Sequence, residues 1–202
     1  MDTATRPGAT PGVLELARSW RTVDLVVAAV IGVTMGVVFW VWGLLWAATG
    51  PLFAVFPPAQ ALFYGVWMLA GVLGGLVIRK PGATVMTSVA AAAVSMMLGA
   101  QGGVTVVFMG LGQGLLPELV FLALRYRYWN MGAAILAGAA AGLTPAVRDA
   151  LVDHVTWQLS HNLIYGGLVL FSAALVGGVG ARLLTTALAR AGALTPFASA
   201  RG

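Results

Sequence analysis

Residues 25–78 read LVVAAVIGVTMGVVFWVWGLLWAATGPLFAVFPPAQALFYGVWMLAGVLGGLVI and contain no formally charged side chain. A helix needs about 20 consecutive apolar residues to cross the hydrocarbon core of a bilayer, so this run is too long for one crossing. Three prolines between residues 51 and 58 interrupt it, and proline breaks the hydrogen-bond ladder of a helix. The stretch therefore predicts two membrane-spanning helices, over about residues 25–46 and 59–78.

The composition of the whole chain supports a membrane protein. Of its 202 residues 60% are hydrophobic and 8% are charged, whereas a soluble domain has about 25% charged residues. A membrane β-barrel would show short segments of alternating apolar and polar residues. The apolar runs here are continuous, and helices satisfy their own backbone hydrogen bonds in lipid. The sequence thus predicts an all-α integral membrane protein of the cell membrane, and it excludes a soluble or disordered chain.

Further apolar segments follow, separated by charged residues or by glycine-rich breaks. They predict four more helices, over about residues 82–98, 104–124, 130–147 and 162–188. The expected fold is a bundle of six transmembrane helices. The chain then divides into a flexible N-terminal tail (1–20), the transmembrane substrate-binding domain (21–190) and a C-terminal tail (191–202).

The positions of the cations predict the orientation of this bundle. Ten of the eleven Lys and Arg side chains fall on one side of a six-helix topology, and Arg148 is the exception. Lys and Arg are enriched in cytoplasmic loops, so both termini are expected to be cytoplasmic. The net charge of +5 is then a property of these loops, and no nucleic-acid partner is expected.

Aromatic and polar side chains gather on the predicted outer side, where polar groups within a membrane often have a function. Trp157, His161 and Tyr165 follow at four-residue spacing, which would align them on one helical face. Together with other residues at similar depth they predict a pocket for a flat heterocycle or a small cation, because aromatic faces attract cations. The candidate substrate-binding residues are Gln60, Tyr64, Trp67, Gln101, Gln113, Trp157, His161, Asn162 and Tyr165. Trp and Tyr also form interfacial belts that bind nothing, which is the favoured interpretation of Trp40, Trp42 and Trp46.

Glu118 is the one carboxylate within a predicted span. It could pair with Arg125 or Arg127 near the inner surface, or it could be a substrate-binding counter-charge for a cation, a role open also to Asp153. The residue spacing leaves both interpretations open.

Small residues form a stripe along the first predicted helix. Ala28, Gly32 and Gly36 stand at four-residue spacing, which lets another helix approach closely. This stripe could serve packing within the bundle or contact with a partner, and spacing alone favours packing.

Motifs for catalysis and for metal binding are missing from the sequence. It has no phosphate-binding loop, nucleophile elbow or zinc-protease motif, and it contains no cysteine, so thiolate metal sites and disulfides are excluded. A non-catalytic protein without a metal or a cofactor is expected.

Three short segments resemble a known transporter family. They are Arg79-Lys-Pro-Gly-Ala83, the Glu118-Leu-Val-Phe stretch that runs into Arg125-Tyr-Arg127 and Trp129, and the Arg190–Phe197 tail. In this order they resemble S components of energy-coupling factor vitamin transporters, and in particular the YkoE branch, which is associated with thiamine or its hydroxymethylpyrimidine precursor. The resemblance covers nearly the whole chain from Trp20 onward.

The resemblance implies a substrate-binding subunit that captures a vitamin from outside and associates with a transmembrane coupling subunit and two cytoplasmic ATPases. It also implies that Ala28, Gly32 and Gly36 contact the coupling subunit, and that residues 47–58 form a lid over the site. Two alternatives remain open: a different small vitamin or nucleobase-like ligand, and an oligomeric channel or scaffold assembled through the Gly/Ala stripes. A membrane enzyme is disfavoured, because Glu118 has no second catalytic group at its depth.

Overall fold

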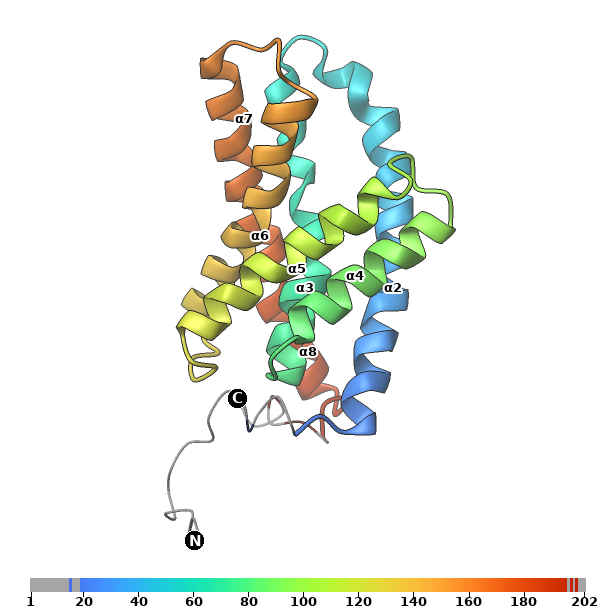
Figure 1. Cartoon of the computed structure of the whole chain (residues 1–202), viewed down its shortest axis with the longest axis vertical. Helices are drawn as coiled ribbons and strands as arrows, with labels where there is room; N and C mark the ends of the chain where they lie inside the picture. Colours follow the sequence, from blue (N-terminus) through green and yellow to red (C-terminus); the bar gives the residue numbers. More distant parts are fainter. Residues whose placement is uncertain (1–14, 16–18, 196, 198, 200–202) are drawn as a thin grey trace, which may run out of the picture.

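The structure, a computed structural model, describes residues 15, 19–195, 197 and 199, and the regular elements among them are helices (Figure 1). In chain order these elements are α2 (Thr22–Thr49), the 3₁₀ helices η1 (Gly50–Phe53) and η2 (Pro57–Phe63), α3 (Gly65–Ile78), α4 (Ala83–Met97), α5 (Thr105–Ala123), α6 (Met131–Val152), α7 (Leu159–Ser172), the π-helical segment η3 (Ala173–Gly180) and α8 (Ala181–Arg190). The predicted all-α class is confirmed.

Five helical stretches of the described chain are long and apolar enough to cross a membrane. They cover residues 22–53, 57–78, 105–123, 131–152 and 159–190. The remaining predicted helix, 82–98, is present as α4, but its 15 residues make it only about 22 Å long at 1.5 Å per residue. This is shorter than the hydrocarbon core of about 30 Å, and α4 runs obliquely across the bundle in Figure 1. The bundle therefore has five full-length spans and one shorter apolar helix, all at the predicted places.

α6 extends beyond its predicted end. The sequence predicts a helix over 130–147, whereas α6 continues through Pro145 to Val152. Proline removes one backbone hydrogen bond, a loss that membrane helices tolerate when neighbouring groups satisfy the freed carbonyl. The extension matters because it places Arg148 and Asp149 on a helix instead of in a loop.

α3 lies at the centre of the bundle and contacts α2, α4, α5, α6 and α8. Eleven of its 14 residues are buried, which explains why this span is hydrophobic all round. Glycine lets its neighbours approach: a Cβ on Gly74 would lie 2.2 Å from Oγ1 of Thr87 on α4. The outer face of α2, by contrast, exposes valines and leucines, as expected of a helix in contact with lipid.

The small-residue stripe of α2 faces the interior of the bundle. Ala28, Gly32 and Gly36 are buried, and a Cβ on either glycine would lie 2.5 Å from a Cβ of α4, that of Ala90 or of Val94. The stripe therefore lets α2 and α4 pack closely. The bundle leaves no exposed surface at these residues, and the contact with a coupling subunit and the alternative of oligomerisation stay predictions.

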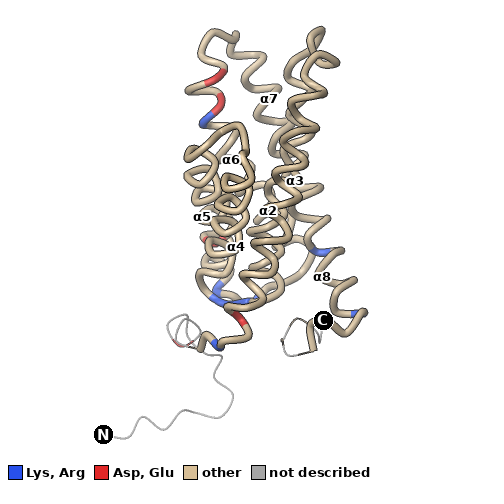
Figure 2. Tube along the Cα trace, turned by 90° about the vertical axis from the view of Figure 1, so that its right-hand side faces the viewer, with Lys and Arg blue, Asp and Glu red and all other residues tan. Residues whose placement is uncertain are grey.

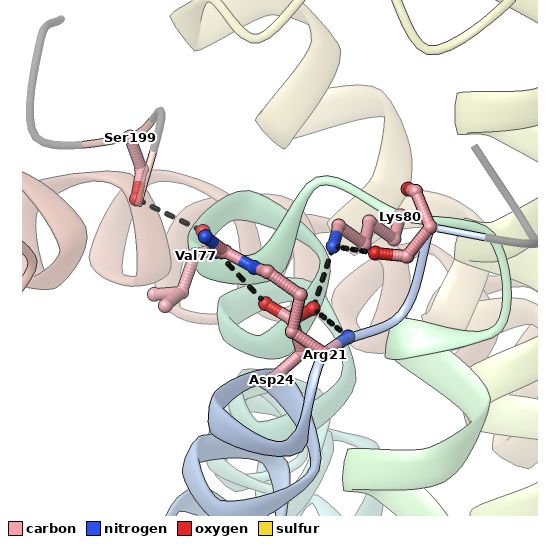
Figure 3. A network of polar contacts seen from close by, with 6 residues as sticks. Arg21, Asp24, Val77, Lys80 and Ser199 are labelled. Atoms are coloured by element: carbon pink, nitrogen blue, oxygen red, sulfur yellow. Dashed lines mark hydrogen bonds and ion pairs between the residues drawn. The ribbon is translucent and has the colours of Figure 1, made fainter. Parts of the chain in front are cut away.

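The start of α2 and the end of α8 lie at the same end of the bundle (Figure 1). Lys and Arg side chains gather towards this end, whereas a smaller group of basic and acidic residues lies near the opposite end (Figure 2). We call the end of the bundle where α2 starts and α8 ends the basic end. A polar network holds it together (Figure 3): Lys80 Nζ lies 2.5 Å from Oδ2 of the buried Asp24, and the backbone N–H of Arg21 donates to the same oxygen at 2.7 Å.

The two predicted tails differ in what the structure describes. Most of the N-terminal tail (1–20) lies outside the described residues, although Trp20 donates its indole N–H to the carbonyl of Pro81 at 3.1 Å. In the C-terminal segment (191–202), the described residue Phe197 is buried. This part of the C-terminal segment thus packs on the bundle.

Candidate functional site

A cavity of about 300 Å³ opens among the helices. Its walls come from α2, α3, α4, α5, α6 and the loop between α4 and α5. It reaches the last turns of α2 and α6, at Trp46 and Asp149. Because α2 begins at the basic end, the cavity lies towards the opposite end of the bundle.

Aromatic rings form one wall of this cavity, and they are Phe39, Trp40, Trp46, Tyr64 and Trp67. Three of them contact one another: the ring of Trp46 lies edge to face with Tyr64 at a centroid distance of 5.0 Å and with Trp67 at 5.5 Å, and the rings of Tyr64 and Trp67 are tilted at 5.4 Å. Such tilted contacts are the favoured packing of aromatic rings. The wall is therefore a fixed group of rings whose remaining faces can stack on a flat ligand.

Hydrogen bonds between α2 and the segment before α3 hold this wall. The indole N–H of Trp42 donates to the carbonyl of Phe63 at 2.8 Å, and the Gln60 amide donates to the carbonyl of Trp46 at 2.9 Å. Gln60, a predicted ligand-binding residue, is thus a neighbour of the cavity that positions Trp46, and it is not part of the cavity lining.

A buried carboxylate lies against the aromatic wall. Asp149 is only 1% exposed, and its Oδ2 accepts hydrogen bonds from the phenols of Tyr64 and Tyr165, the latter at 2.6 Å. Its Oδ1 lies 3.0 Å from Nη1 of Arg148. A buried charge is tolerated when it is paired and hydrogen-bonded, and these three partners satisfy that condition.

Two predicted glutamines also line the cavity. Gln113, midway along α5, is 7% exposed, and within the described part of the chain its amide makes no hydrogen bond. An amide offers two donors and one acceptor oxygen, so this side chain is available to a ligand. Gln101 lies in the loop between α4 and α5, at the exposed side of the cavity.

The cluster predicted around Trp157 forms a separate feature. The ring of Trp157 stacks on His154 at a centroid distance of 3.8 Å, and the Asn162 amide donates to the His154 carbonyl at 3.2 Å. Trp157 and His161 line a second, open hollow beside Pro57. Of the predicted binding residues, the cavity is thus lined by Tyr64, Trp67, Gln101 and Gln113, and the second hollow by Trp157 and His161.

Tyr165 connects the two hollows. Its ring lies edge to face with Trp157 at 5.9 Å and with Tyr64 at 6.1 Å, while its phenol reaches Asp149. Trp157 precedes α7, which begins at Leu159, so it is not on one helical face with His161 and Tyr165. Its ring nevertheless contacts both, at 6.4 Å from His161.

Glu118 is a residue of α5. Its carboxylate lies away from the cavity, beside the N-terminus of α4. It accepts hydrogen bonds from the backbone N–H groups of Gly82 and Thr84 at 2.8 and 3.2 Å, and from the hydroxyls of Thr84 and Tyr126. The carboxylate thus satisfies free N–H groups of the helix start, where the helix dipole also favours a negative charge. Burial, followed by the hydrogen bond to Glu118, raises the pKa of Tyr126, which keeps this phenol a donor. This arrangement explains Glu118 structurally, and the counter-charge role remains an untested prediction.

The loop that lines the cavity differs from the lid implied by the family resemblance. Gly99, Ala100, Gln101 and Gly102, between α4 and α5, line it. None of residues 47–58, all of which the structure describes, does so.

Sequence reasoning missed four polar or aromatic residues that line the cavity. Trp40 and Trp46 are expected in an interfacial belt, Arg148 stands only as the exception to the cation pattern, and Asp149 beside it is not among the candidates. The available signal was the pair Arg148-Asp149 itself, because it contains the one cation predicted on the outer side.

Comparisons with known proteins agree with one another on a transport role. A family model described as "ABC-type cobalt transport system, permease component" matches residues 23–144. A protein of Bacillus subtilis (strain 168) named as an HMP/thiamine permease, YkoE, is 32% identical over 184 residues, 90% of each chain. The fold also matches a crystal structure of an S-component of an ECF transporter with a TM-score of 0.86 and 29% identity, covering 91% of this chain and 92% of the other.

Proposed function

Because the chain belongs to the S components of energy-coupling factor transporters, in the branch of YkoE, we propose that it captures thiamine or its hydroxymethylpyrimidine precursor (HMP). It is a multi-pass membrane protein of a transport system. The proposed binding site is the cavity beside Asp149.

The observation that carries this proposal is the combination of an aromatic wall, a buried carboxylate and an unpartnered amide around one cavity. The rings of Trp46 and Trp67 suit stacking against a flat aminopyrimidine. The Gln113 amide can pair with ring nitrogens and with the exocyclic amine. Asp149 can accept a hydrogen bond from that amine or oppose a cationic thiazolium.

The size of the cavity supports a small ligand. Its volume of about 300 Å³ is at the lower end of the range of about 300–1,000 Å³ for ligand pockets. The description of the matching family names cobalt, which would be a different cargo. Within the described residues, however, no group of three or more His, Asp or Glu side chains is placed to hold a metal ion. One wall of the cavity consists of aromatic rings instead. We therefore favour an organic ligand, and a different small vitamin or nucleobase-like solute is the next candidate.

The proposal includes the orientation of the chain in the membrane and the subunits with which it works. The enrichment of Lys and Arg in cytoplasmic loops puts the basic end inside the cell and opens the cavity to the outside. The chain has no phosphate-binding loop, so uptake against a gradient needs a transmembrane coupling subunit and two ATPases from outside this chain. The face of α2 that is exposed here, rather than its buried stripe, is the surface left for such a subunit.

Binding is testable by titrating the purified, detergent-solubilised protein with thiamine and with HMP while tryptophan fluorescence is followed. Trp40, Trp46 and Trp67 line the cavity, so ligand stacking should quench their emission at micromolar concentrations. Gln113→Leu should weaken binding by about 5- to 100-fold, the effect of removing one or two hydrogen bonds to a bound ligand. Gln158→Leu, in the second hollow, is the matched control and should bind normally. An absence of quenching by both ligands would refute the proposed substrate.

A further inference from the structure

Arg148 contacts two carboxylates at once, one in the cavity and one at the surface. We propose that Arg148 is a built-in substitute for a cationic ligand: it neutralises Asp149 while the site is empty and moves to Asp153 when a cation enters. The proposal rests on the proposed function, because it concerns the same cavity. It makes Arg148 a specificity-determining residue that distinguishes cationic from neutral ligands.

The geometry shows one guanidinium shared between two sites. Nη1 of Arg148 lies 3.0 Å from Oδ1 of Asp149 and also contacts Oδ2 of Asp153. The side chain of Asp149 is 2% exposed and that of Asp153 is 46% exposed, while that of Arg148 is intermediate at 34%. Arg148 thus lies between the cavity, which it lines, and the solvent at the end of α6.

The two carboxylates need Arg148 to different degrees. Asp149 is buried, and removing the cationic partner of a buried carboxylate is costly. Its Oδ2 has two phenol donors, whereas its Oδ1 accepts a hydrogen bond from Arg148. Asp153 is half exposed, and an exposed ion pair contributes little. Water can therefore replace Arg148 at Asp153, but only another cation or a strong donor can replace it at Asp149.

A cationic ligand can take over the role of Arg148. When a positive group reaches Oδ1 of Asp149, the guanidinium is released without leaving a buried charge, and Asp153 is already within contact distance to receive it. A neutral ligand offers no such exchange, so Arg148 stays on Asp149. The relative affinity for cationic thiamine and neutral HMP should therefore depend on Arg148 and Asp153, although both ligands carry the same pyrimidine.

Two substitutions test this exchange in the full-length protein. Arg148→Gln removes the competing cation and should lower the Kd for thiamine by about tenfold, the effect of one partly buried charge pair, with a much smaller change for HMP. Asp153→Asn removes the receiving carboxylate and should raise the Kd for thiamine severalfold, again with little change for HMP. Arg190→Gln, at the basic end, is the control and should leave both constants unchanged.

The outcomes separate this inference from the proposed function. If the wild-type protein binds thiamine or HMP but both variants change the two Kd values by equal factors, or change neither, the exchange is refuted and the proposed function stands. If the wild-type protein binds neither ligand, both fail. Should Arg148→Gln not fold, Asp153→Asn, a substitution at a half-exposed side chain, decides the question by itself.

Discussion

Asp149 and Glu118 are both surrounded by helices, but their partners give them different roles. Asp149 lies beside a cavity. One of its oxygens accepts hydrogen bonds from two phenols, and the other pairs with the long side chain of an arginine. Glu118 accepts from two backbone N–H groups and two hydroxyls of its own bundle. A carboxylate whose oxygens are all held by fixed groups serves the fold, whereas one with an exchangeable partner can serve a ligand.

At the scale of single residues, Glu118→Ala should lower the stability of the protein and leave ligand binding unchanged. The substitution leaves the N–H groups at the start of α4 without acceptors, a loss of about 1–3 kcal/mol for a buried donor. Thermal unfolding in detergent and a thiamine titration of the same sample measure the two effects. Tyr126→Phe removes one donor and should give a smaller loss of stability. A loss of thiamine affinity at unchanged melting temperature would return Glu118 to the ligand site.

At the scale of helices, hydrophobicity and charge predicted the spans well. The predicted helix 104–124 corresponds to α5, and the predicted helix 162–188 corresponds to the continuous stretch from α7 to α8. Length and apolar composition fix such segments, because the bilayer sets how many residues a crossing needs. This physical constraint is local, so a single sequence reveals it.

Helix ends and helix faces were predicted less well, and both errors affected the site. α6 continues through Pro145, which the sequence suggested was near its end, and Asp149 was therefore not recognised as a cavity residue. Four-residue spacing suggested one face for Trp157 and His161, but α7 starts between them. Periodicity shows which residues could share a face and does not show where the helix begins. Tertiary contacts decide that.

The orientation of a helix about its axis was also beyond the sequence. The spacing of Gly32 and Gly36 is the same whether the stripe faces α4 or an external partner. Only the partner's position, seen in the structure as Ala90 and Val94 of α4, distinguishes these alternatives.

α6 and η3 pack so closely at Gly178 that no side chain fits between them. A Cβ on Gly178 would lie 2.6 Å from the carbonyl oxygen of Ala134 and 2.8 Å from Cα of Ile135. Both are backbone atoms that cannot move alone, so Gly178→Ala should destabilise the protein by about 1–3 kcal/mol, the usual cost of overpacking.

Thermal unfolding of Gly178→Ala should show a melting temperature lower by several degrees. Gly167→Ala on α7 is the matched control, because no heavy atom lies within 4 Å of its added Cβ, and alanine is the better helix former. Its melting temperature should stay the same or rise slightly. Equal melting temperatures for the two variants would contradict the close packing of α6 on η3.

At the scale of the whole molecule, the chain separates two kinds of surface. Basic side chains gather towards the end where α2 starts and α8 ends (Figure 2), while the aromatic cavity opens near the other ends of α2 and α6. The cations of a membrane protein face the cytoplasm. With the proposed orientation, the basic end in the cytoplasm, the cavity would open to the outside, as capture of a solute from outside requires.

Ligand protection of a single cysteine tests the central claim, that this cavity binds the vitamin from outside. The natural chain has no cysteine, so Thr105→Cys, at an exposed position in the cavity wall, introduces one reactive thiol. His161→Cys, in the second hollow, is the matched control. We expect a membrane-impermeant maleimide to label both variants on intact cells, and saturating thiamine to slow labelling at position 105 only. Labelling of Thr105→Cys only after permeabilisation, or at a rate that thiamine does not change, would contradict the account.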